Sequence, residues 1–239
     1  MIGFGKFSKM AETTTITSLT SLTDNRLVKI DPQEPGFFDE VLNFKSTNKS
    51  INDFIEAVAE VKEERIEAFY RPIYDPSDAG DHLVAYMKGM RPATGHSYNW
   101  WVKTASNMPA VEGRHWCVVT EYQYYAFLVW LINQLIKAET VEETLNQIII
   151  DSKELGHYYN SKGSTKGNDF EPTGSRCICG IYDLANVAKI LACSNQEAGG
   201  FWLGGGNFGY DSCNYPLANL YLSTNVDNDF HYSVGMLVL

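Results

Sequence analysis

The strongest periodic pattern in the chain lies between residues 51 and 67. Apolar side chains recur there every three or four residues, and glutamates occupy the opposite positions. This spacing predicts an amphipathic helix with one buried and one solvated face. The glutamates could instead form a catalytic or metal-binding cluster, but a solvated helix face explains them without chemistry, and we favour that interpretation. They are Glu56, Glu60, Glu63, Glu64 and Glu67.

Two further helices and a region of short strands are predicted downstream. Thr120 is a suitable N-cap for a helix with a broad apolar stripe, which predicts burial. Thr140 is a suitable N-cap for a third helix, with Gly156 as its stop. After a polar loop at 157–169, short apolar stretches alternate with turn residues to the end of the chain. This layout predicts an α+β fold, and the Thr-rich stretch 13–23 predicts an exposed strand or extended arm.

The C-terminal segment 199–239 has an unusual composition. It contains no Lys, Arg, Glu or Gln, so all 19 Lys and Arg residues of the chain precede it. Aromatic, short polar and glycine residues remain, and these suit an exposed recognition surface. A buried, low-charge β-region is the alternative. We favour the recognition surface because the segment includes Asn207, Asp211, Asn214, Asn219, Asp227, Asn228 and Asp229.

The overall composition indicates a folded protein without nucleic-acid or membrane contacts. The 239 residues are 44% hydrophobic, which is enough for one large core or two modest ones. The formal net charge of −10 argues against a nucleic-acid partner, since phosphate binding needs a clustered basic surface. No apolar run reaches the roughly 20 residues needed to span a bilayer, and the apolar length before residue 13 is too short for a secretory signal. We therefore expect no membrane insertion, and synthesis in the cytoplasm.

The five cysteines follow no disulfide-scaffold spacing, and their number is odd. Buried free thiols are therefore expected. Cys177 and Cys179 could place two sulfurs on one face of a strand, but without a second cysteine pair or nearby histidines they are a poor zinc site.

Three motifs, in order, resemble the formylglycine-generating-enzyme-like domains. Residues 117–131 read CVVTEYQYYAFLVWL, residues 180–191 read GIYDLANVAKIL, and residues 199–202 read GGFW before the closing stretch LANLYLSTNVDNDFHYSVGMLVL. The resemblance implies a C-type-lectin-like fold over residues 100–239, with small twisted antiparallel sheets and helices. Residues 1–99 would then form an N-terminal region for attachment or oligomerisation.

The catalytic cysteines of that family have no counterpart here. Counted from the GG pair, their positions fall on Gly204 and Gly209, and Cys213 is out of register. Oxidation of a substrate cysteine needs a sulfur nucleophile, so the resemblance implies a protein that is not an enzyme. The alternative is a formylglycine-generating-type or related sulfur-oxidising enzyme that uses displaced residues.

The non-catalytic branch that the chain resembles is the variable proteins of diversity-generating retroelements. Their C-terminal surface is hypervariable because template adenines are randomised, often turning AAY codons into NNY codons, which exclude Lys, Glu, Gln, Met and Trp. The composition of 199–239 agrees with this, with Trp202 as a fixed scaffold position and Met236 beyond the varied stretch. The resemblance implies ligand or receptor binding, in a phage tail receptor-binding protein or a cell-surface display protein.

The expected partner is a protein or glycan receptor on a host or neighbouring cell, bound by a chain that can form a homo-oligomer. The expected location is the virion tail, with the cytoplasm as the alternative. No cofactor is required; the acidic loop 225–229 leaves calcium open, although it lacks the Gly and distal Glu of a helix-loop-helix site. Each aromatic candidate could equally serve the core. The candidate ligand-binding residues are Phe201, Leu203, Gly204, Asn207, Phe208, Tyr210, Asp211, Tyr215, Asn219, Tyr221, Asp227, Asp229, Phe230, His231 and Tyr232.

Overall fold

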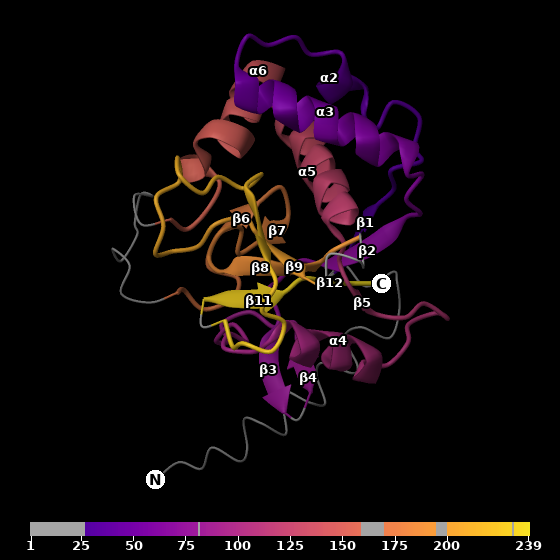
Figure 1. Ribbon diagram of the computed structural model, residues 1–239, viewed down its shortest axis with the longest axis vertical. Helices are drawn as coiled ribbons and strands as arrows, with labels where there is room; N and C mark the ends of the chain where they lie inside the picture. Colours follow the sequence, from indigo (N-terminus) through magenta and orange to yellow (C-terminus); the bar gives the residue numbers. More distant parts are fainter. Residues whose placement is uncertain (1–26, 81, 159–169, 195–199, 231) are drawn as a thin grey trace.

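The computed structural model describes residues 27–80, 82–158, 170–194, 200–230 and 232–239. Over these residues the chain is a mixed α+β protein with five α-helices and several small sheets, which confirms the predicted class (Figure 1). Strands β8, β9 and β11 lie between a group of helices at one end and the helix α4 (Tyr98–Asn107) at the other, where β3 and β4 also lie (Figure 1). The stretch 13–23, predicted as a strand or arm, lies outside the described residues.

The largest sheet has four strands in the order β10-β9-β8-β11. Strand β9 is antiparallel to both of its neighbours, whereas β11 runs parallel to β8. Ile190 and Leu191 in β8 are both fully buried although they point to opposite faces, so both faces of this central strand are covered. The strands are β8 (Ala188–Ala192), β9 (Phe201–Gly204), β10 (Leu220–Ser223) and β11 (Ser233–Gly235).

Four two-stranded ribbons surround this sheet, and one of them lies beside the end of the chain. Tyr70 in β2 and the terminal Leu239 exchange backbone hydrogen bonds of 2.9 and 3.0 Å. The described part of residues 1–99 is therefore paired with the C-terminal strands, while its role in attachment stays a prediction. The ribbons are β1 (Leu27–Ile30) with β2 (Phe69–Pro72), β3 (Ser77–Gly80) with β4 (Leu83–Ala85), β5 (Cys117–Val118) with β12 (Leu237–Val238), and β6 (Cys177–Ile178) with β7 (Ile181–Tyr182).

The two longest helices confirm the periodicity argument. Helix α3 (Lys49–Glu63) buries one apolar face, and Glu56, Glu60 and Glu63 lie on its solvated face as predicted. Glu64 and Glu67 are also exposed but lie beyond the end of the helix. Helix α5 (Glu121–Leu135) begins at a capping box in which Thr120 and Gln123 satisfy each other's backbone N–H groups. It is buried along most of its length, as its broad apolar stripe predicts. The short α2 (Asp39–Leu42) precedes α3.

The third predicted helix is shorter than expected. Thr140 does cap α6 (Val141–Leu145), but a π-helical turn follows at Asn146–Ile150 and a 3₁₀ turn at Ser152–Glu154, so regular helix ends well before Gly156. The irregular turns bind the C-terminal segment: the Ala218 N–H donates to the Ile148 carbonyl at 3.0 Å, and the Leu217 N–H donates to Ser152 Oγ at 2.8 Å. These turns therefore hold in place the segment that leads into β10.

Two hydrophobic clusters lie on either side of the four-stranded sheet. One joins the helices α3 and α5 to the sheet and includes Leu191, while the other joins α4 to the sheet and includes Ile190. Both clusters contain residues from before and after position 100, so the described residues share their core across the predicted domain boundary. None of the described helices combines the length and apolar character needed to cross a membrane.

A cluster of four charged side chains is buried beside β8. Lys189 Nζ donates a hydrogen bond to Asp75 Oδ2, and the Arg71 guanidinium lies 3.9 Å from Asp75 Oδ1. Asp183 accepts hydrogen bonds from the Gly174 N–H at 2.8 Å and from the Asp75 N–H at 3.3 Å. Burial lowers the pKa of Lys189 and of Arg71, and it raises the pKa of Asp183 to about 6. Two cations and two carboxyls thus compensate one another inside the protein.

The expectation of buried thiols is wrong. The cysteines are free, but Cys117, Cys177, Cys179 and Cys213 are exposed and Cys193 is partly exposed. Cys179 also does not continue a strand: Cys179 and Gly180 both have positive φ, at 51° and 83°, and form the two-residue turn between β6 and β7. Cys117, Cys177 and Cys179 are exposed because this hairpin and the short β5 lie at the surface.

The buried charges predict a large effect of Asp75→Asn on stability. The change leaves Lys189 and Arg71 without their carboxylate, and we expect the free energy of unfolding to fall by about 3–5 kcal/mol in urea denaturation. The control is Asp53→Asn, which breaks the exposed Lys49–Asp53 pair and should leave that free energy nearly unchanged. Equal effects of the two changes would contradict the structural role of the cluster.

The raised pKa of Asp183 predicts how stability varies with pH. Its folded-state pKa of about 6 lies above the ordinary value of 3.8, because burial and the nearby Asp75 disfavour its charged form. The folded protein therefore holds this proton more tightly than the unfolded chain does, and the stabilising contribution is lost as the pH rises from about 4 to 6.

The variant Asp183→Asn should remove that contribution. We expect the free energy of unfolding of the variant, measured by urea denaturation at several pH values, to fall less steeply between pH 4 and 6 than that of the parent. Carboxyls such as Asp31, whose pKa is lowered by its hydrogen bond with Lys29, contribute the opposite slope in both proteins and cancel in the comparison. Parallel curves for the two proteins would show that Asp183 does not titrate in this range.

Candidate ligand-binding pocket

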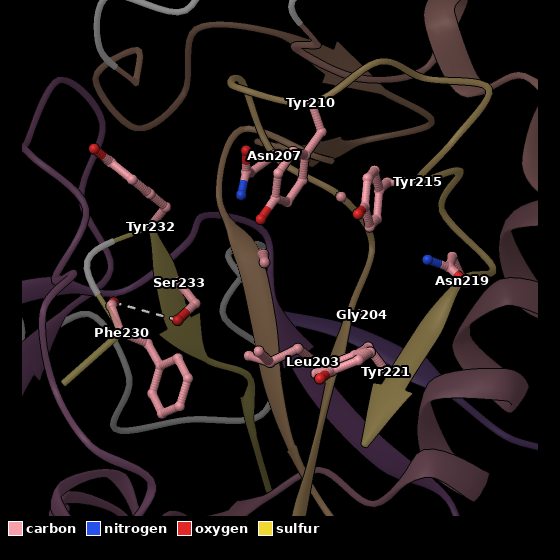
Figure 2. A pocket seen from close by; sticks show the side chains of 12 residues that line it. Leu203, Gly204, Asn207, Tyr210, Tyr215, Asn219, Tyr221, Phe230, Tyr232 and Ser233 are labelled. Carbon is pink, nitrogen blue, oxygen red and sulfur yellow. Dashed lines mark hydrogen bonds between the residues drawn. The ribbon is translucent and has the colours of Figure 1, made fainter. Parts of the chain in front are cut away.

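A pocket of about 420 Å³ opens over the four-stranded sheet (Figure 2). Strands β8, β9, β10 and β11 and the loops that join them supply its walls. With the exception of Ala188, every lining residue comes from the segment of unusual composition. The lining consists of Ala188, Leu203, Gly204, Gly206, Asn207, Tyr210, Tyr215, Asn219, Tyr221, Phe230, Tyr232 and Ser233.

Four exposed tyrosines form the rim of the pocket. Tyr210 and Tyr215 stack on each other with ring centroids 4.2 Å apart, while Tyr221 stands on β10 and Tyr232 precedes β11 (Figure 2). Their exposed fractions are 43%, 40%, 65% and 57%. Only two other large hydrophobic residues of the described chain are this exposed, so the exposed aromatic surface is concentrated at one place. Such concentration marks interaction sites on protein surfaces.

The polar groups of the lining are amides and hydroxyls. Asn207 is buried, and its Oδ1 accepts a hydrogen bond from the Gly209 N–H at 2.9 Å. Ser233 Oγ donates to the Phe230 carbonyl at 3.3 Å, and Asn219 lies at the β10 side. Among the described lining residues there is no Asp, Glu, Lys, Arg, His or Cys, so tyrosine hydroxyls are their only titratable groups.

The turn Gly204–Gly206 after β9 forms the floor of the pocket. Gly205 and Gly206 have φ values of +82° and +61°, in the left-handed region that favours glycine. A Cβ atom on Gly206 would lie 2.4 Å from the Tyr215 carbonyl oxygen and 2.5 Å from Tyr158 Cε1. The Tyr158 hydroxyl donates to the Gly205 carbonyl at 3.3 Å, and the Tyr124 hydroxyl donates to the Leu217 carbonyl at 2.8 Å. Buried tyrosines therefore hold the floor from below.

The segment that carries Phe230 and Tyr232 is held by earlier parts of the chain. Asn99 at the start of α4 donates from Nδ2 to Asp227 Oδ1 at 2.6 Å, and the Gly95 N–H donates to the Phe230 carbonyl at 3.1 Å. The Ala188 N–H donates to the Tyr232 carbonyl at 3.0 Å. The pocket is thus built from the C-terminal segment but positioned by residues before it.

The structure brings nine of the fifteen candidate residues into the pocket lining. Whether they bind a ligand stays a prediction, but their convergence from separate strands and loops gives them a common site. They are Leu203, Gly204, Asn207, Tyr210, Tyr215, Asn219, Tyr221, Phe230 and Tyr232.

Five of the other six candidates lie outside the lining. Phe201 is fully buried against Tyr98 and Phe230, and Phe208 is buried against Phe170 and Tyr232, so both belong to the core. Asp211 accepts a hydrogen bond from the Cys213 N–H, Asp227 is bonded to Asn99, and Asp229 is exposed outside the lining. His231 falls outside the described residues.

Three lining residues were not among the candidates. Gly206 and Ser233 adjoin the candidates Asn207 and Tyr232 in the sequence. Ala188 had no signal, because it reaches the pocket through the parallel pairing of β8 with β11, in which Ser233 lies opposite Ala188. Pairing between strands so far apart in sequence cannot be read from either strand alone.

The positions that correspond to catalytic cysteines also have a defined place. Gly204 lies in the lining, Gly209 is exposed beside it, and Cys213 is outside the lining. No group of three or more His, Cys, Asp or Glu side chains suited to a metal ion occurs in the described part of the chain. The loop 225–229, which left calcium open, uses Asp227 to bind Asn99.

Comparison with known proteins yields one distant likeness to report. No family model matches the chain, and no curated protein matches it. The solved structure of PvdO from Pseudomonas aeruginosa is similar at 14% sequence identity and a TM-score of 0.45, over 72% of this chain and 80% of that one. This degree of likeness assigns neither a family nor an activity to the chain.

The close packing at Gly206 predicts that Gly206→Ala lowers the free energy of unfolding more than an alanine at an uncrowded glycine does. The new methyl group adds steric overlap to backbone strain, and we expect the free energy of unfolding to fall by about 2–4 kcal/mol. The control is Gly113→Ala, which has a similar φ of +81° but no atom near the added Cβ, and should cost about 1–2 kcal/mol. Urea denaturation of both variants measures the difference. Equal losses of unfolding free energy would mean that the residues around Gly206 shift to accommodate the added methyl group.

Proposed function

We propose that the chain is a non-catalytic recognition protein that binds a protein or glycan receptor in the pocket over its four-stranded sheet. The observation that carries this proposal is the clustering of four exposed tyrosines around a concave, neutral lining drawn almost entirely from one segment. Rigid aromatic side chains supply contact area at low entropic cost, and amides and hydroxyls adapt to different partners. Concave sites with a few convergent polar groups are typical of ligand binding.

We further propose that the chain is a variable protein of a diversity-generating retroelement. Every exposed residue of the rim, together with Leu203, Asn207, Asn219 and Phe230, is of a type that an NNY codon can encode. Fixed positions in the same segment have structural reasons instead. A Cβ on Gly200 would lie 2.5 Å from the Ser223 carbonyl oxygen, and one on Gly235 would lie 2.3 Å from the Trp101 ring. The positions that we expect to vary are thus different from those that packing constrains.

A C-type-lectin-like fold is the architecture that we propose for this display. The three motifs occupy defined structural units in the same order: the first runs from β5 into the capped helix α5, the second spans β7 and β8, and the third leads into β9. The closing stretch supplies β10, β11 and β12. This order, in which the last strands frame the pocket, supports the proposal.

The alternative of a sulfur-oxidising enzyme is less well supported. Its chemistry needs a thiol at the site, and the described lining has glycine at one of the two expected cysteine positions and no cysteine elsewhere. We therefore assign no catalytic residue. We also propose that the protein is located at a phage tail or on a cell surface. Residues 1–99 would then serve attachment or oligomerisation.

Deep sequencing of the segment's coding region in a natural population tests this function. We expect substitutions to concentrate at the codons of Tyr210, Tyr215, Asn219, Tyr221 and Tyr232, where side chains reach solvent and tolerate exchange. The codons of Gly200, Gly206 and Gly235, where an added Cβ would overlap neighbouring atoms, are the internal control and should stay constant. Substitutions spread evenly over both sets, or absent from both, would contradict the display function.

A further inference from the structure

On the premise of the recognition function above, we propose that the pocket takes an uncharged saccharide unit: one ring of a neutral hexose or N-acetylhexosamine within the receptor's glycan. The proposal narrows a protein or glycan receptor to one chemical class. It follows from the charge, the aromatic surface and the hydrogen-bonding groups of the described lining.

The lining excludes a strongly charged ligand on electrostatic grounds. The chain carries a net charge of −10, yet the described pocket lining holds neither a carboxylate nor a cation. A charged group that leaves water for a concave site needs a compensating charge or several strong hydrogen bonds. An acidic sugar would find no Arg or Lys here, and the excess of carboxylates elsewhere on the chain would repel it.

The tyrosine rim suits the shape of a sugar ring. A pyranose has one or two faces of C–H groups, which pack on aromatic faces, and an edge of hydroxyl groups. Tyr221 and Tyr232 stand at opposite sides of the pocket, and the stacked pair Tyr210–Tyr215 forms a third aromatic wall (Figure 2). Each tyrosine also has a hydroxyl that can donate or accept a hydrogen bond.

The remaining polar groups match hydroxyls rather than a protein side chain. The amides of Asn207 and Asn219 and the hydroxyl of Ser233 include both donors and acceptors, as sugar hydroxyls do. An arginine anchor from a protein partner would meet no carboxylate in the described lining, and an apolar anchor would use none of the amide and hydroxyl groups of that lining. The volume of about 420 Å³ falls in the range of small-ligand sites.

The first test is binding of the full-length protein to an immobilised panel of neutral, sialylated, uronic and sulfated glycans, followed by titration with free methyl glycosides. We expect binding to neutral glycans. Tyr221→Ala should weaken it by about tenfold or more, because an aromatic face is lost. Tyr221→Phe keeps the ring and loses only the hydroxyl, so its affinity for neutral glycans should stay within about threefold of the parent's affinity.

The matched control is Leu222→Ala, the next residue on β10. Leu222 is 38% exposed but is not part of the lining, so its truncation should leave glycan affinity unchanged. Circular dichroism of each variant confirms that it is folded.

A parallel selection from a displayed random-peptide library separates this proposal from the recognition function. One outcome is that the protein binds peptides or acidic glycans but no neutral glycan, and that Tyr221→Ala abolishes this binding. That outcome would overturn the saccharide proposal and would support recognition by the pocket. Neutral-glycan binding that Tyr221→Ala leaves unchanged would also overturn it, since the sugar would then bind elsewhere. If no probe of either kind binds, the saccharide proposal fails, and the population sequencing described above decides the recognition function independently.

Discussion

The buried charge cluster of Arg71, Asp75, Asp183 and Lys189 is the constraint on which the rest of the structure depends. It joins β2 and its following loop to β8, strands that lie more than a hundred residues apart. Removal of one partner would leave a charge in the interior, so the cluster tolerates only one arrangement of these strands. Successive strand residues point to opposite faces, and Lys189 in the cluster therefore directs Ala188 toward the pocket. Ser233 of β11 pairs with this same strand β8, opposite Ala188.

Above this sheet, the residues that keep the backbone rigid are different from those whose side chains are exposed. The glycine turn is held from below by Tyr124 and Tyr158, where no side chain can be added without overlap. The tyrosines of the rim are 40–65% exposed, and the Tyr232 ring also packs on buried Phe208. A surface built in this way can change its side chains while the backbone beneath keeps its shape. This division of roles is the physical basis of the proposed display function, and it explains how one scaffold could serve several partners.

The sequence predicted those parts of the fold that depend on local patterns. Helical periodicity identified α3 and α5, Thr120 and Thr140 marked the starts of two helices, and the composition of 199–239 identified most of the pocket lining. Features set by long-range contacts were missed. Ala188 enters the site only through parallel pairing, and the π-helical turn binds a segment some seventy residues away, as the Ala218–Ile148 hydrogen bond shows. Composition also could not separate buried Phe201 from exposed Tyr221, because aromatic residues suit both environments.

Saturation mutagenesis of residues 200–230 and 232–239, read out as resistance to proteolysis, tests most directly the claim that the pocket rim can vary without loss of the fold. The account predicts that Tyr210, Tyr215, Asn219, Tyr221 and Tyr232 accept most substitutions, since exposed positions contribute little to stability. Substitutions at Phe201, Phe208, Gly206 and Gly235 should instead make the chain sensitive to protease. A rim as intolerant as these core positions would contradict the account, because the tyrosines would then be part of the fold rather than a surface free to change.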